Sequence, residues 1–302
     1  MSIQKASRDF TGEIPHCAVL MAAYNGEYWI SQQIDTILDQ VSVEITLFIS
    51  VDLSSDSTLD IVQRRSEKDE RIKVLPYGER FGGAGRNFFR LIKDVSTEAF
   101  DLIAFADQDD IWLDNKLVTA WSRISSGICD VYSSDVTAFW EDGRTELIKK
   151  SYPQRKYDYL FEAAGPGCTY VFSAYAFSEV KRFVSENYLS CNEVTLHDWL
   201  LYAYCRQAKF LWFIDDEPLM LYRQHSSNQV GTNNNCKAYL KRLLKVKDKW
   251  YREQVATIAE LVVLGAPGYC ITRKFLLTNI RELRRRPRDQ VVLFLLVLLG
   301  LF

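Results

Sequence analysis

The sequence predicts an α/β protein with a mostly parallel central sheet and flanking helices. Three observations support this class. Continuous apolar runs of strand length recur in the first half of the chain, and segments with helical spacing of apolar residues separate them. The 302 residues are 48% apolar and 25% charged, a composition typical of a globular protein with a large core. Strands of continuous apolar character that alternate with helices indicate βαβ units.

The first half of the chain contains four expected strands and three expected helices. The strands are residues 17–23, 44–51, 72–77 and 100–106. The helices between them are residues 27–40, 56–66 and 85–95. Asp56 or Ser57 stands near the N-cap of the second helix, where a short polar side chain is favoured. After residue 130 the pattern changes to short strands and helices, and no internal repeat is visible.

Charge divides the chain near residues 226–235, a Ser-, Asn- and Gly-rich stretch typical of a loop or linker. Residues 236–290 carry 14 Lys and Arg against five Asp and Glu, whereas the rest of the chain is acidic. Residues 291–302, "VVLFLLVLLGLF", are uncharged and apolar. As a helix they would extend only ~18 Å, against ~30 Å of bilayer hydrocarbon, so we do not expect them to span a membrane.

The seven cysteines and the first sixteen residues bear on the compartment. The cysteines are scattered without a CxxC pair, which argues against both a disulfide framework and a zinc site and fits a reducing cytosol. The first sixteen residues have no apolar core, so no secretory signal is expected. The sequence therefore predicts a cytoplasmic protein, with no nucleic-acid partner.

An acidic cluster follows the fourth expected strand. Asp107, Asp109 and Asp110 occupy three of four consecutive positions, and like charges this close repel unless a cation lies among them. "AAYNGE" (22–27) and "VDLSSDS" (51–57) follow the first and second strands, and open α/β sheets bind ligands at the carboxyl ends of their strands. A solvated turn that caps the next helix is the alternative. Three clusters at one sheet edge favour a ligand site.

The chemistry of this site points to a divalent metal and a diphosphate. Carboxylate oxygens suit Mg²⁺ or Mn²⁺, and such an ion completes its shell with substrate phosphates. A diphosphate leaving group needs the cation because negative charge develops as it departs. The sequence therefore predicts Mg²⁺ or Mn²⁺ carrying a nucleotide diphosphate.

Six motifs in order resemble a known enzyme family. They are "VLMAAYNGE", "ISVDLSSDST", "FADQDDIWLDNKL", "GCTYVFS", "HDWL" and "YRQHSSNQVG". The chain resembles family 2 glycosyltransferases of the GT-A fold over about residues 17–231, and most closely the bacterial rhamnosyltransferase-like branch of cell-surface polysaccharide synthesis. The resemblance implies an inverting transferase that moves a sugar from a nucleotide diphosphate to an acceptor hydroxyl. dTDP-rhamnose is the favoured donor, with UDP-sugars next, and a lipid-linked or polysaccharide glycan is the expected acceptor.

The resemblance also implies an organisation of the chain. Residues 1–231 would form the GT-A domain, with a nucleotide-binding part at about 17–125 and an acceptor-binding part at about 126–231. Residues 236–302 lie outside these motifs, and from their charge and apolar spacing we expect a C-terminal helical region with its apolar tail.

Donor and metal residues are carried over from the family's motifs. Asp109 matches the last acid of the family's DXD motif, and it and His225 are the expected metal ligands. The expected donor-binding residues are Ala22, Tyr24, Asp52, Arg86, Asp107 and Gln108. A core tyrosine, a turn-capping aspartate and a solvated helix arginine remain alternatives for Tyr24, Asp52 and Arg86. Val51 and Leu53 depart from the family's pattern of paired acids and a glycine, which leaves the shape of the base pocket open.

Asp198, in "HDWLLYAYC", matches the family's general base. Inversion by direct displacement needs one carboxylate on the acceptor side to take the hydroxyl proton. The alternative is that Asp198 only caps the following helix. The expected acceptor-side residues are Gly167, Cys168, Thr169, Trp112 and His197.

The C-terminal region has two interpretations. Residues 239–264 and 273–288 interleave basic and apolar side chains at near-helical spacing. They could dock on an anionic inner-membrane surface, with the apolar tail as a shallow anchor, or they could form helices that pack on the body. Two other classes remain for the whole chain: a Mg²⁺-dependent phosphatase or nucleotidyltransferase, and a non-catalytic membrane scaffold with a degenerate fold. Metal-dependent release of a nucleoside diphosphate would separate a transferase from a scaffold.

Overall fold

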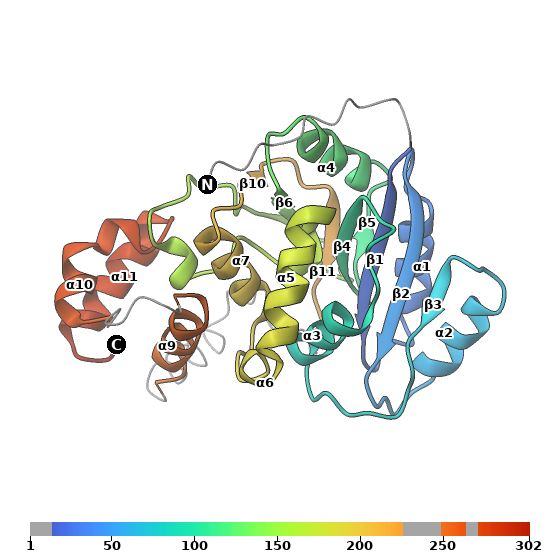
Figure 1. Ribbon diagram of the computed structural model, residues 1–302, viewed down its shortest axis with the longest axis horizontal. Helices are drawn as coiled ribbons and strands as arrows, with labels where there is room; N and C mark the ends of the chain where they lie inside the picture. Colours follow the sequence, from blue (N-terminus) through green and yellow to red (C-terminus); the bar gives the residue numbers. More distant parts are fainter. Residues whose placement is uncertain (1–13, 226–248, 264–270) are drawn as a thin grey trace.

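A computed structural model describes residues 14–225, 249–263 and 271–302 (Figure 1). The central sheet has seven strands in the order β10-β6-β9-β4-β1-β2-β3. Its strands are β1 (His16–Ala23), β2 (Glu44–Val51), β3 (Ile72–Val74), β4 (Leu102–Asp107), β6 (Val131–Ser134), β9 (Val171–Ser173) and β10 (Trp212–Asp215). Only β9 runs antiparallel to its neighbours β4 and β6 among these strands, so the sheet is mixed and mostly parallel.

Helices cover both faces of this sheet because the strands are apolar on both sides. Leu20 packs in the same core cluster as α3 (Ala84–Asp94), α5 (Ala174–Glu186) and α7 (His197–Gln207). Met21, the next residue of β1, packs in the opposite cluster with α1 (Ile30–Leu38), α2 (Thr58–Ser66) and α4 (Lys116–Ser125). Successive side chains of a strand point to opposite faces, so one strand serves both clusters. The predicted α/β architecture is confirmed, with element ends that differ by up to three residues.

A second, four-stranded sheet joins the acidic loop to the end of the body. Its order is β5-β11-β7-β8, with β5 (Ile111–Trp112), β11 (Met220–Arg223), β7 (Val136–Phe139) and β8 (Thr145–Ile148). β11 pairs antiparallel with β5, which immediately follows the acidic cluster. This pairing carries His225 to the acidic loop although 116 residues separate it from Asp109.

The C-terminal helices gather on the α7 side of the molecule, away from α2 and β3 (Figure 1). They are α9 (Trp250–Val262), α10 (Arg273–Thr278) and α11 (Pro287–Leu298), with a short 3₁₀ turn at Ile280–Glu282. Val255, Leu276 and Leu293 are buried in the same core cluster as α7. The predicted helix 239–264 is seen from residue 250, its start and the linker at 226–235 lie outside the described residues, and the segment 273–288 is broken into three pieces.

The apolar tail is helical, and α11 contains its first eight residues. No helix in the described ranges has both the length and the apolar character needed to cross a bilayer. The body and the C-terminal helices share one core cluster. The remaining elements are the short helix α6 (Tyr188–Cys191) and the 3₁₀ turns Asp158–Leu160 and Gly167–Thr169.

Candidate active site

A cleft of about 1020 Å³ opens at the carboxyl ends of β1 and β4. Ala22 of β1 pairs with Asp107 of β4 in the parallel register, and both line the cleft. From β1 the chain continues to β2 on one side, whereas β4 lies on the other, so this is the point where the strand order reverses. Ligands of open α/β sheets bind at such a point. The cleft runs from here past Asp198 to Arg284, Arg285, Arg286 and Arg288 of the C-terminal region.

Tyr24 and Gln108 fasten the first loop to the acidic loop. The Tyr24 N–H donates to Gln108 Oε1, and Gln108 Nε2 donates to the Tyr24 carbonyl, each over 2.7 Å. A Cβ placed on Gly26 would lie 2.3 Å from Gln108 Oε1, so only glycine leaves room for this pair. Tyr24 is half exposed and lines the cleft, which is the position expected of a residue that stacks on a base.

The acidic cluster is under electrostatic strain. Burial, followed by the charge of Asp109, raises the pKa of Asp107 to about 7. The same two causes raise the pKa of Asp110 well above its usual range, and Asp110 Oδ2 is buried with no hydrogen-bond partner in the described chain. Lys116 lies behind the cluster with its Nζ 3.8 Å from the Trp112 ring centroid. A cation on the cleft side would relieve the repulsion among these carboxylates.

His225 lies against Asp109. The His225 Nε2 and Asp109 Oδ2 atoms are 2.6 Å apart, and the imidazole stacks on Trp29 with ring centroids 4.2 Å apart. Arg223 fixes the loop by donating its Nε to the Asp109 carbonyl over 2.7 Å. Both expected metal ligands thus line one part of the cleft.

Two residue sets near this point could hold a cation. Asp107, Asp110 and Cys168 place one ligand atom each within 4.8 Å of one another, but Asp110 and Cys168 are buried and do not line the cleft. Asp109, His225 and Asp107 do line it, so an ion there would be within reach of a substrate phosphate. Carboxylate oxygens suit Mg²⁺ or Mn²⁺, and burial raises the pKa of the Cys168 thiol well above its usual range. The cleft-lining set fits the expected metal better.

Asp52 holds the loop that follows β3. Its carboxylate accepts the N–H groups of Phe81 and Gly82, each over 2.9 Å, and lines the cleft. Asp52 therefore stabilises a turn, which was the alternative role expected for it, whether or not it also contacts a base. The prediction that Arg86 binds the donor is corrected, because Arg86 does not line the cleft. Its Nε donates to the Asn192 carbonyl over 3.1 Å, since the first turn of α3 directs the side chain toward α6.

Arg80, rather than Arg86, lines the cleft. The sequence signal was the stretch "GERFGGAGRNF", which carries an arginine on each side of the glycines. The sequence alone does not show which of the two faces the cleft.

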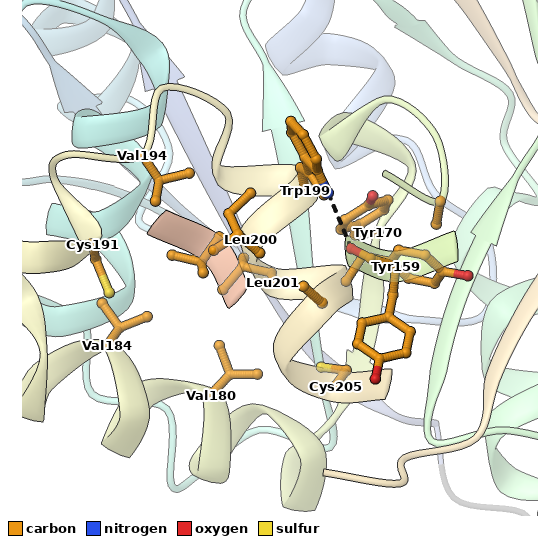
Figure 2. Packing of buried hydrophobic residues seen from close by; sticks show 14 of the residues in the cluster. Tyr159, Tyr170, Val180, Val184, Cys191, Val194, Trp199, Leu200, Leu201 and Cys205 are labelled. Atoms are coloured by element: carbon orange, nitrogen blue, oxygen red, sulfur yellow. Dashed lines mark hydrogen bonds between the residues drawn. The ribbon is translucent and has the colours of Figure 1, made fainter. Parts of the chain in front are cut away.

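Asp198 lies in the first turn of α7, which is buried on several sides. Figure 2 shows Leu200, Leu201 and Cys205 of this helix packed toward α5, and the Trp199 Nε1–H donates to the Tyr159 carbonyl over 3.0 Å. The Asp198 side chain itself lines the cleft. Burial raises its pKa to about 6, opposed by the Trp199 N–H and the charge of Lys150. A carboxylate of this kind is ionised at neutral pH and still accepts a proton readily.

Gly165, Pro166 and Gly167 form the wall beneath Asp198. A Cβ on Gly167 would lie 2.5 Å from His197 Nε2 and 3.3 Å from Asp198 Cβ, so glycine permits this close approach. His197 stacks on Phe88 with centroids 4.1 Å apart, and burial lowers its pKa to about 3, so it stays neutral. His197 borders the cleft next to Asp198.

Three expected acceptor-side residues are corrected. Cys168 and Thr169 follow Gly167 but are fully buried and do not line the cleft, because the 3₁₀ turn directs them into the core. Trp112 is 3% exposed and packs in the core, since it is the inward residue of β5 and covers Lys116. These three side chains are buried beneath the wall of the site and are not exposed in the cleft.

Comparison with known proteins agrees with this geometry. The model of glycosyl transferase family 2 matches residues 18–181. The dTDP-rhamnosyl transferase RfbG of Shigella flexneri is 43% identical over 291 residues, covering 93% of this chain and 100% of that protein. The GalNAc(5)-diNAcBac-PP-undecaprenol beta-1,3-glucosyltransferase of Campylobacter jejuni is 25% identical over 277 residues, covering 84% and 83%.

A solved structure shows the same fold. The mannosyltransferase PcManGT of Pyrobaculum calidifontis, in complex with GDP-Man and Mn²⁺, superposes with a TM-score of 0.53 at 13% identity, covering 95% of this chain and 86% of that chain. The fold and the cleft thus define a GT-A-like α/β protein, as the sequence predicted. The chain belongs to glycosyl transferase family 2. It is a glycosyltransferase that uses a nucleotide sugar, and the phosphatase and nucleotidyltransferase alternatives fall away.

Proposed function

We propose that this enzyme transfers rhamnose, with inversion, from dTDP-rhamnose to a hydroxyl of a glycan acceptor in cell-surface polysaccharide synthesis. The donor follows from the name of the Shigella flexneri relative, which this chain matches over its full length. The observation that carries the proposal is that Asp198 lines the same cleft as Asp107 and Asp109, close enough for its charge to raise the pKa of Asp107. The cleft thus presents a base and an acidic, cation-attracting end together.

In this mechanism Asp198 accepts the proton of the acceptor hydroxyl. The hydroxyl oxygen forms its bond to the anomeric carbon as the bond from that carbon to the diphosphate oxygen breaks, and the electron pair leaves with dTDP. Tyr24 and Asp52 would contact the nucleotide, and Arg80 would face its phosphates. The wall at Gly167 would leave space for the acceptor beside the base.

Mg²⁺ or Mn²⁺ is the proposed cofactor. Asp109 and His225 would hold the ion, with Asp107 beside them, and it would neutralise the charge that develops on the leaving diphosphate. The donor set of oxygens and one imidazole suits either ion, and the Pyrobaculum structure contains Mn²⁺.

The proposed location is the cytoplasmic face of the membrane, on an anionic surface. Seven apolar side chains in or just after α11 are more than a third exposed: Val291, Val292, Phe294, Leu295, Leu298, Leu299 and Leu301. Shallow insertion of such a face into a leaflet is favourable. Arg284 and Arg285 face the body, however, so the docking charge comes from the other basic residues.

The test uses the full-length chain with dTDP-rhamnose, UDP-glucose and GDP-mannose, each with Mg²⁺, Mn²⁺ or EDTA. We expect dTDP-rhamnose with metal to raise the Tm most, because a ligand at 100 times its Kd stabilises by ~2.7 kcal/mol. Slow release of dTDP should follow and should accelerate with a glycan acceptor. If no nucleotide sugar raises the Tm and no nucleoside diphosphate is released, the chain is a scaffold with a degenerate site.

A further inference from the structure

The end of the cleft beyond Asp198 is basic. Six Lys and Arg side chains line it against three Glu and Asp: Lys149, Lys150, Arg284, Arg285, Arg286 and Arg288 against Glu146, Glu162 and Asp289. They come from the segment after β8 and from the start of α11, which are about 135 residues apart in the chain. Nothing in the donor chemistry described above uses this end.

Three of these arginines pair with the acidic side chains. Arg284 lies 3.4 Å and Arg288 3.3 Å from Asp289, and Arg285 lies 3.5 Å from Glu162. Arg285 also reaches Asp158, a fully buried carboxylate that lies outside the cleft lining. Even so, Arg285 Nη1 is buried with no hydrogen-bond partner in the described ranges. The compensation at this end is incomplete.

Lys150 lines this basic end beside the arginines. It packs on the wall of the site, where a Cβ on Gly165 would lie 3.3 Å from Lys150 Cγ. Burial, followed by the charges of Arg286 and Arg285, lowers the pKa of Lys150 to about 8. Positive charges gathered in this way repel one another unless an anion lies among them.

An exposed apolar stripe begins where the basic end stops. Arg288 lines the cleft in the first turn of α11, and residues three, four, seven and eleven positions further lie on the same face of a helix. These are Val291, Val292, Leu295 and Leu299, with 59%, 49%, 50% and 70% of their surface exposed. A ligand with an anionic group at the arginines would find an apolar surface directly beside it.

We propose that Lys150, Arg285, Arg286 and Arg288 bind a phosphate or diphosphate group carried by the acceptor, and that the stripe on α11 receives the lipid chain attached to it. The site rests on the proposed function and extends it: the acceptor is an amphiphile whose anionic group is held at the basic end. Its glycan would then lie toward Asp198, and the donor diphosphate would remain at the acidic end.

Farnesyl diphosphate, a short prenyl diphosphate, is the probe. Its affinity for the full-length chain is measured by calorimetry with Mg²⁺ and saturating dTDP, so that the donor site is filled. We expect the Arg286→Gln/Arg288→Gln variant to bind it at least tenfold more weakly, because bonds to two charged donors are lost. Lys274→Gln/Arg281→Gln removes the same charge from the same region outside the cleft and should bind as the wild type does.

Three further measurements separate the sources of the phosphate. Inorganic pyrophosphate should bind more weakly than farnesyl diphosphate, and Leu295→Gln/Leu299→Gln should remove that difference. dTDP affinity with Mg²⁺ should be unchanged in Arg286→Gln/Arg288→Gln. Glycerol phosphate, which offers a lipid-headgroup phosphate without an apolar chain, should not displace the probe at equal phosphate.

Two outcomes overturn the proposal. If Arg286→Gln/Arg288→Gln loses dTDP affinity as strongly as probe affinity, the basic end serves the donor. If farnesyl diphosphate does not bind the wild type, the basic end is not an acceptor site. The same conclusion follows if Arg286→Gln/Arg288→Gln binds it as tightly as the control Lys274→Gln/Arg281→Gln does. If dTDP-rhamnose still raises the Tm, either result leaves the proposed function standing. The failure of the acceptor site can therefore be told apart from the failure of the proposed function.

Discussion

The two ends of the cleft have opposite charge and opposite origins in the sequence. At the acidic end, Asp107 is the last residue of β4 and Asp109 lies in the loop that follows it. At the basic end, Lys150 and Arg286 come from segments far apart, brought together by packing of the C-terminal helices on the body. Each end crowds like charges that a ligand would compensate. A cleft built in this way can hold two anionic groups in different ways, one through a cation and one directly.

The largest effect is expected at the base between the two ends. Asp198→Asn keeps the shape but cannot take a proton, so kcat should fall by roughly 10²- to 10⁴-fold. Nucleotide-sugar affinity, measured by calorimetry, should stay within about twofold because the acidic end is unchanged. Equal losses of affinity and rate would place Asp198 in the donor site and would break the separation of the two ends.

At the acidic end, Asp109→Asn should lower metal-dependent kcat/KM by about 10²-fold, the usual size for loss of one charge-stabilising group. The metal concentration at half-maximal activity should rise as well, measured with Mn²⁺ by titration. Asp114→Asn is the matched control, since Asp114 is exposed and outside the cleft. A variant with near wild-type transfer would remove Asp109 from the metal site.

The pH profile tests how the basic end acts on the base. Burial raises the pKa of Asp198 to about 6, so the carboxylate is protonated below that pH and kcat/KM should fall about tenfold per pH unit there. Because the charge of Lys150 lowers this pKa, Lys150→Met should move the acid limb to higher pH. An acid limb that stays in place would show that Lys150 does not influence the base.

The smallest effect distinguishes the two arginines beside the glycines. Arg80→Gln should raise the KM for the nucleotide sugar several-fold, because Arg80 lines the donor part of the cleft. Arg86→Gln should change that KM by less than about twofold, since its guanidinium contacts the Asn192 carbonyl instead. Steady-state kinetics with varied donor decide the matter, and the reverse order would restore Arg86 as the donor contact.

The sequence predicted the acidic end well because its determinants are local. Apolar strands fix where the sheet edge lies, and Asp107 is the last residue of one of them. Trp112 and Cys168 failed as site residues because the same local reasoning cannot tell which side chain of a turn points into the core. The basic end could not be predicted, since the arginines of residues 284–286 gain their position from contacts with distant segments, among them residues 158–164 and Lys149. From the sequence alone they were equally suited to lipid headgroups.

Arg285 also determines how this chain could be recombined with a relative. It crosses from the C-terminal region to the acceptor wall, where it donates to the Ala163 and Ala164 carbonyls and lies 3.6 Å from the buried Asp158 carboxylate. A chimera joined near residue 231 would take both sides of this contact from different parents, and a buried charge left without its partner destabilises by about 3–5 kcal/mol. A junction near residue 125 avoids that mismatch. A chimera that exchanges residues 126–302 as one unit would take both sides of the Arg285 contact from the same parent.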